Sequence, residues 1–217
     1  MRLTTLYVAL GVFLTAVQAF AQPYPSMANE ATNGVYFQGG LSFGSSETGG
    51  AIGAAFSHDL SGRLGLEVAG GYLGRGPGVD AWNVSGSLLV YLREADEEVV
   101  PFLSAGAGMY RTSYDFGHPR FSGIWDDGAW NIGTFGRMYG PMHGWSRFAD
   151  RALFPNRGPR PGNRVSFTDP AFPLGGGVRW SVSDRLSLRA DARALVVVAD
   201  RETFTVGLLT AGVGLRF

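Results

Sequence analysis

The sequence predicts an all-β protein, an eight-stranded antiparallel up-and-down β-barrel. Eight segments alternate between apolar side chains and small or polar ones, and such alternation is typical of strands whose two faces meet different media. Segment 204–217 alternates to its end at Phe217, and an unpaired edge would remain unless segment 34–44 paired with it and closed a barrel.

The amino-terminal region predicts export. Residues 1–21 combine Arg2, an apolar run and a small-x-small motif ending at Ala21, as a secretory signal peptide does. We therefore expect a signal peptide over 1–21, a polar periplasmic lead-in over 22–33 and one barrel domain over 34–217. No later apolar run is long enough for a transmembrane helix.

The composition narrows the possible partners. Basic and acidic residues balance at 18 each, so the charge gives no reason to expect a nucleic-acid partner. Every basic residue is Arg, and cysteine is absent, so an exported chain of this kind must fold without disulfides.

The expected strands follow one another with turn residues between them. In order they are 34–44, 50–58, 63–73, 81–93, 99–112, 171–182, 186–198 and 204–217. The connections after the second, fourth and sixth strands are short, and the longer ones follow the first, third, fifth and seventh. This arrangement predicts periplasmic turns at one rim and extracellular loops at the other, with one long extracellular loop over 113–168.

Periodicity does not say whether the apolar face points outward or inward, and a soluble ligand-binding barrel would turn it inward. The other face carries mostly Gly, Ser and Ala, which suit the inside of a narrow barrel. The apolar face carries two belts of aromatic residues, as a membrane-spanning barrel requires. These belts are Phe43, Tyr72, Trp82 and Phe172 near the loops, and Phe37, Phe56, Trp180 and Phe217 near the turns.

With its signal peptide, eight alternating segments and closing AGVGLRF, the chain resembles small OmpA-like outer-membrane β-barrel proteins of Gram-negative bacteria. The stretches VVPFLSAGAGMYR and PLGGGVRWSVSDRLSLRADARAL resemble the fifth to seventh strands of that family. The resemblance implies that the chain resides in the cell outer membrane. It also implies that the barrel-assembly machinery reads a terminal signal made of Phe217, Leu215, Val213 and Ala211.

Alternation places a set of charged residues inside the barrel. They are Glu67, Arg179, Arg189, Asp191, Arg193 and Arg216. Buried charges need partners, so we expect an Arg–carboxylate network. It would be either a structural plug, which we favour because narrow lumens are usually filled, or a gate across a narrow water path.

Segment 113–168 is the candidate recognition element, because it is long and rich in both aromatic residues and Arg. Its candidate contact residues are Trp125, Trp130, Arg137, Trp145, Arg147 and Arg151. Arg suits the phosphates of lipopolysaccharide, although the same residues could form a self-packed cap.

Catalysis is not expected. Ser57, His58 and Asp59 are consecutive, so neighbours would point to opposite faces of a strand and could not form a relay. His118 and His143 lie in the long segment without ligand-like or catalytic spacing, so we expect no metal and no cofactor. The sequence thus favours an outer-membrane barrel with a structural or surface-binding role and an unidentified extracellular ligand. The alternatives are a narrow solute channel gated by lumen charges and a lipid A-modifying enzyme.

Overall fold

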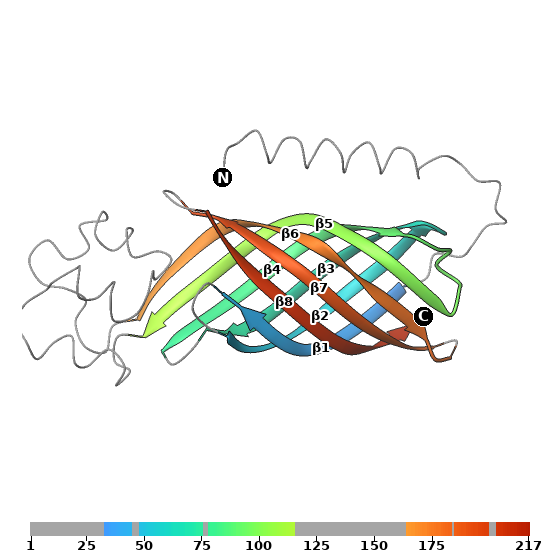
Figure 1. Cartoon of the computed structure of the whole chain (residues 1–217), viewed down its shortest axis with the longest axis horizontal. Helices are drawn as coiled ribbons and strands as arrows, with labels where there is room; N and C mark the ends of the chain where they lie inside the picture. The colour runs from blue at the N-terminus through green and yellow to red at the C-terminus, as the bar shows by residue number, and fades with distance from the viewer. Residues whose placement is uncertain (1–32, 45–47, 76–77, 116–163, 184, 200–202) are drawn as a thin grey trace, which may run out of the picture.

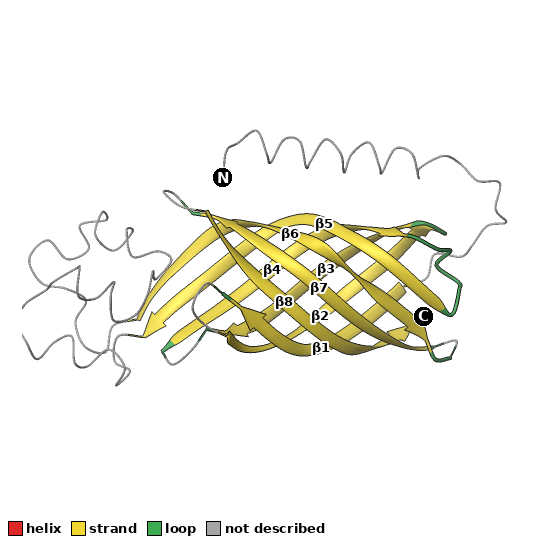
Figure 2. Cartoon of the chain, viewed as in Figure 1, coloured by secondary structure: helices red, strands yellow, loops and turns green. Residues whose placement is uncertain are grey.

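The computed structural model describes residues 33–44, 48–75, 78–115, 164–183, 185–199 and 203–217. They form a closed barrel of eight strands, tilted against the barrel axis (Figure 1). The strands are β1 (Asn33–Phe43), β2 (Thr48–Ser61), β3 (Leu64–Gly74), β4 (Val79–Tyr91), β5 (Val99–Asp115), β6 (Arg164–Ser181), β7 (Leu186–Val198) and β8 (Thr203–Arg216). Short loops join the strands where the connections are described (Figure 2).

Every strand pairs antiparallel with its neighbours in sequence, and β1 pairs with β8 to close the barrel. The closing register runs from Gly34 opposite Arg216 to Phe43 opposite Gly207. Beyond it, Asn33 and Phe217 exchange two backbone hydrogen bonds of 3.0 Å each. The predicted up-and-down barrel and its closure by the first and last strands are thus confirmed.

The two rims differ in what they contain. The turn side carries the β2–β3, β4–β5 and β6–β7 connections together with Asn33 and Phe217, and the loop side carries the other four connections. The lengths depart from the expected pattern, because β1–β2, β3–β4 and β7–β8 are joined by only four residues each, at 44–47, 75–78 and 199–202. Only the connection over 116–163 is long, so this connection alone distinguishes the loop side by length.

Three strands extend at one end by three residues or more beyond the bounds that their sequence patterns indicate. The second strand continues through Asp59 to Ser61, where the sequence predicts a turn. The fifth continues to Asp115, and the sixth begins at Arg164 rather than at residue 171. Proline lacks a backbone donor, but pairing of Pro170 with Met109 and of Pro173 with Leu195 carries the strand past both prolines. The long connection is accordingly 116–163, shorter than the expected 113–168.

The outer surface of the barrel is apolar. Phe37 and Ile52 are each 66% exposed, and comparably large apolar side chains are exposed on all eight strands. Tyr36, Glu67, Arg179 and Arg189 instead point into the lumen, where each is less than 5% exposed. Among the described residues there is no helix of the length and apolarity that a membrane span demands.

Candidate functional site

Most of the described charged residues of the lumen gather in two clusters, and we call the first of them the central cluster. It consists of Glu67 on β3 with Arg189, Asp191 and Arg193 on β7. β3 and β7 are four strands apart in a ring of eight, so the ion pairs of Glu67 with Arg189 and Arg193 cross the barrel between opposite walls. The cluster therefore braces the lumen as well as filling it.

The contacts within the central cluster are dense. Arg189 donates to Glu67 and holds Asp191 through its Nε, 2.8 Å from Oδ2. Arg193 lies 2.7 Å from Glu67 and 2.9 Å from Asp191, and Gln38 of β1 donates to Asp191 over 3.0 Å. Two carboxylates face two guanidinium groups, so the cluster has no net charge.

Aromatic rings enclose the Arg189 guanidinium. Its central carbon lies 5.1 Å from the centre of the Tyr36 ring and 4.6 Å from that of Phe102. Such cation–π contacts are stronger where the cation is desolvated. Tyr36, Phe102 and Gln38 were absent from the network expected from the sequence, since no charge marks them.

A second group, the turn-side cluster, closes the mouth of the barrel on the turn side. It consists of Asp59 on β2, Tyr91 on β4 and Arg179 on β6. Arg179 lies 3.3 Å from Asp59, and its guanidinium is 4.8 Å from the centre of the Tyr91 ring. Strands β2 and β6 are again opposite one another, so this cluster is a second cross-brace.

The turn between β4 and β5 folds onto this cluster. Ala95 in that turn is only 7% exposed, and its carbonyl oxygen accepts a 2.7 Å hydrogen bond from Arg179. Its amide donates to Gly62 in the β2–β3 turn over 2.8 Å. The turn-side mouth is thus covered by the β4–β5 turn, which Arg179 holds in place.

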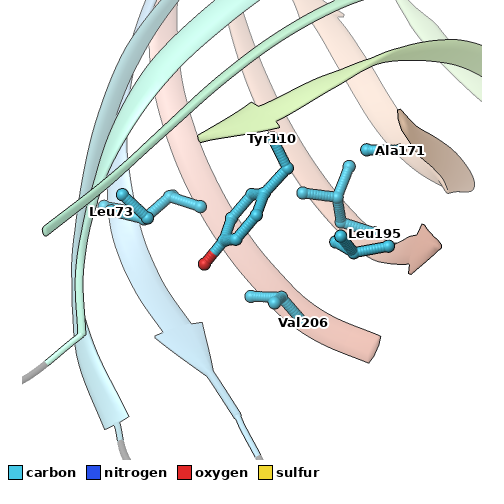
Figure 3. Close-up of a cluster of buried hydrophobic side chains, with 8 residues drawn as sticks. Leu73, Tyr110, Ala171, Leu195 and Val206 are labelled. Carbon is cyan, nitrogen blue, oxygen red and sulfur yellow. The ribbon is translucent and has the colours of Figure 1, made fainter. Parts of the chain in front are cut away.

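Toward the loop side the lumen is filled mainly by apolar side chains, although Asp169 of β6, opposite Tyr110 in the β5–β6 pairing, is also buried there. The apolar cluster consists of Ala51, Leu73, Ala81, Tyr110, Ala171, Leu195, Val197 and Val206, with Phe204 and Leu208 packed against it. Figure 3 shows the ring of Tyr110 lying among Leu73, Leu195 and Val206. These residues come from every strand except β1, so they fill the cross-section of the barrel.

A cavity of about 50 Å³ lies between the central cluster and the apolar cluster. Its polar lining includes Gln38, Asn83, Ser85, Arg193 and Thr210, and its apolar lining includes Leu195 and Leu208. Gly53 and Gly71 face each other across the β2–β3 ladder at its wall, where a Cβ at either position would come close to the backbone of the neighbouring strand. The volume is enough for a few water molecules and is bordered by groups that can bind them.

The predicted lumen residues therefore do not form one network. Glu67, Arg189, Asp191 and Arg193 come together, whereas Arg179 belongs to the turn-side cluster. Arg216 lies at the turn-side end of β8, where it donates to Ser181 over 3.1 Å. Asp59 was missed because the sequence placed it in a turn.

The remaining predicted residues are placed as follows. Ala211, Val213, Leu215 and Phe217 share the outer face of β8, where Phe217 is 70% exposed. Trp125, Trp130, Arg137, Trp145, Arg147 and Arg151 lie outside the described residues. Tyr114 and Phe167, expected in the loop, are buried strand residues whose rings meet edge to face at 6.2 Å. No group of three His, Asp or Glu within the described ranges could hold a metal ion.

This chain is similar to known proteins in its fold. No protein-family model matches the sequence, and no curated protein matches it either. Among solved structures, Neisserial surface protein A is 13% identical, with 88% of this chain and 100% of that chain covered and a TM-score of 0.55.

Two further solved structures cover 87% of this chain and 100% of their own. Ail, the attachment invasion locus protein of Yersinia pestis, is 11% identical with a TM-score of 0.49. The N-terminal β-barrel domain of Pseudomonas aeruginosa OprF is 12% identical with a TM-score of 0.48. The chain therefore has the fold of the small eight-stranded outer-membrane β-barrels that its sequence resembles.

Proposed function

We propose that the protein is an integral outer-membrane barrel with a structural or surface-binding role, whose loop-side segment 116–163 is the recognition surface. The observation that carries the proposal is that the apolar face of the barrel points outward, while its interior is filled by side chains and braced by ion pairs. An exterior of this kind favours lipid as its surroundings, and an interior of this kind favours a scaffold.

The apolar exterior encircles the barrel. One exposed side chain from each strand illustrates this, in the order Phe37, Ile52, Val68, Val84, Met109, Leu174, Leu188 and Leu209. Soluble monomers rarely expose contiguous apolar patches larger than a few hundred Å². Residence in the outer membrane, after export directed by residues 1–21, accounts for this surface.

The recognition role rests on how the barrel presents the long connection. β5 and β6 are the longest strands, and both extend on the loop side to the ends of segment 116–163. That segment contains the aromatic and Arg residues expected to contact a ligand, including Trp125, Arg137 and Trp145. We propose lipopolysaccharide as the surrounding lipid on this side and the barrel-assembly machinery as the partner during insertion.

The channel alternative is weaker. A path through the lumen would have to pass the turn-side cluster, the central cluster and the apolar cluster in succession. The two charged clusters are neutral as assemblies, so neither offers a field that would draw ions through. We expect the wild-type protein in a planar lipid bilayer to show no stepwise conductance. Regular steps, altered by Glu67→Gln, would favour the channel.

A lipid A-modifying enzyme is the other alternative. The side chain of Ser57 is buried in the lumen beside Glu67, whereas His58 hydrogen-bonds Asn33 at 2.9 Å. Ser57 and His58 occupy opposite faces of β2, which argues against their acting as a nucleophile and its base. We expect lipid A from cells that express the protein to keep its acyl chains, and an altered mass would contradict this.

The first test is the mobility of the membrane-extracted protein in a detergent gel, unheated and boiled. A closed barrel resistant to detergent should migrate faster before boiling. Proteolysis of intact cells should then cleave within 116–163 and leave the barrel intact. Recovery of the protein in the soluble periplasm, with no change in mobility on boiling, would overturn the proposal.

A further inference from the structure

The outer face of β4, β5 and β6 changes from apolar to polar over three successive rows of paired residues. The first row is Val84, Met109 and Pro170, and the second is Trp82, Arg111 and Thr168. The third, nearest the loop side, is Asp80, Ser113 and Ser166. Met109, Arg111 and Thr168 are all exposed, so the middle row lies on the surface, where apolar and polar surfaces meet.

The extent of the apolar surface places this row at the edge of a membrane. The outward-facing residues of β6 are apolar or Gly from Pro170 to Trp180. At about 3.3 Å per residue these ten steps span about 33 Å, and a tilt of about 40° reduces their height to about 25 Å. That is the height of the lipid-facing band of outer-membrane barrels. Arg111 and Thr168 therefore follow directly after the band on the loop side.

Arg111 differs from the other outward-facing Arg nearby. Arg164 lies 2.6 Å from Asp80, and Asp80 also accepts a hydrogen bond from Tyr72. Within the described ranges no carboxylate pairs with Arg111. Its neighbour in the row is Trp82, which is 56% exposed and meets the Tyr72 ring edge to face at 5.2 Å.

We infer that Trp82, Arg111 and Thr168 form a binding site for the phosphorylated headgroup of a lipid in the loop-side leaflet. A guanidinium group can hold two phosphate oxygens at once. Arg111 supplies this group at the depth where headgroups begin, and the indole of Trp82 suits the same interfacial position. The Thr168 hydroxyl adds a donor on the far side of Arg111. The inference rests on the proposed membrane location and adds a residue-level lipid contact to it.

The test measures the thermal unfolding of the folded protein in uncharged maltoside micelles by circular dichroism. The added ligands are diphosphoryl lipid A, the same lipid after removal of its phosphates, and inorganic phosphate. We expect diphosphoryl lipid A to raise the unfolding midpoint of the wild type by about 2–4 °C. The dephosphorylated lipid and inorganic phosphate should leave it unchanged, and Arg111→Gln should abolish the rise.

Arg185→Gln is the matched control, because Arg185 is an exposed Arg on the turn side, and this variant should respond as the wild type does. Arg111→Lys should retain a reduced response, since it keeps the charge without the two-pronged geometry. This variant also serves if Arg111→Gln does not fold. The inference would be overturned if diphosphoryl lipid A raised the unfolding midpoint of the wild type and of the Arg111 variants equally, or if Arg185→Gln lost the rise. It would also be overturned if inorganic phosphate raised the midpoint as much as diphosphoryl lipid A does.

The gel-mobility experiment separates this inference from the proposed function. If the protein inserts into membranes and its gel mobility changes on boiling, but lipid phosphate does not change its unfolding midpoint, only the lipid site is refuted. A protein that does not insert at all would refute both.

Discussion

The two halves of the lumen are filled by different means. The turn-side half is held by ion pairs across the barrel, from Arg179 to Asp59 and from Arg189 to Glu67. The loop-side half is filled by the apolar cluster around Tyr110 and Leu195. Both halves exclude an open path, but they differ in how they respond to the loss of one side chain.

The difference follows from physical chemistry. Removal of one partner from a buried ion pair leaves an uncompensated charge, whose cost is set by desolvation. Removal of an apolar side chain leaves a cavity, whose cost depends on how far the neighbours relax. The charged half should therefore be the more sensitive to a single substitution.

The largest expected effect is that of Glu67→Ala. Glu67 is 2% exposed and is contacted by both Arg189 and Arg193, so its loss leaves two buried cations facing Asp191 alone. We expect the free energy of unfolding to fall by about 3–5 kcal/mol, measured by urea titration in lipid vesicles. A second change at Arg193 should restore part of the loss by removing the surplus positive charge.

Glu97→Ala provides the control for this change. Glu97 pairs with Arg93 at 3.4 Å in the β4–β5 turn, where both side chains are exposed, and such an ion pair contributes less than about 1 kcal/mol. An unfolding midpoint of Glu67→Ala equal to that of Glu97→Ala would show that the central cluster does not brace the barrel.

The two halves also differ in how far the sequence predicted them. Alternation assigned Glu67, Arg189, Asp191 and Arg193 to the lumen, because period-two patterning fixes the face of each residue once the strand is recognised. It could not divide these residues from Arg179, since the division depends on the stagger between strands. Register across the barrel places Arg179 beside Asp59 and away from Glu67.

The apolar cluster shows a second limit of sequence reasoning. Leu195 and Val206 alternate with outward residues that are also apolar or small, so no contrast marks them as lumen residues. The same limit applies to the row formed by Trp82, Arg111 and Thr168 on the outer face of the barrel. Arg111 was assigned to a strand. Its neighbour Trp82 comes from a different strand, and Thr168 lies before the predicted start of the sixth strand at residue 171. Only the observed register brings the three into one row.

Leu195→Ala should have the next largest effect. Leu195 is 1% exposed in the apolar cluster and also lines the cavity of about 50 Å³, so the substitution enlarges an existing space. We expect the free energy of unfolding to fall by about 3 kcal/mol. Leu195→Met, which nearly conserves volume, should cost less than about 1.5 kcal/mol. A loss in the Ala variant as small as that in the Met variant would show that packing at this position contributes little to stability.

The smallest expected effect concerns the loop-side rim, where charge pairing takes place outside the lumen. Arg164 and Asp80 lie 2.6 Å apart, but the Arg164 side chain is 60% exposed. Water and salt screen such a pair, so Arg164→Gln should lower the free energy of unfolding by less than about 1 kcal/mol. The difference from wild type should shrink further as salt is added, because the Debye length falls to about 3 Å at 1 M. The loss in Glu67→Ala should persist under the same conditions, since its partners are buried. A salt-insensitive loss in Arg164→Gln would place this pair with the buried braces and remove the contrast between rim and lumen.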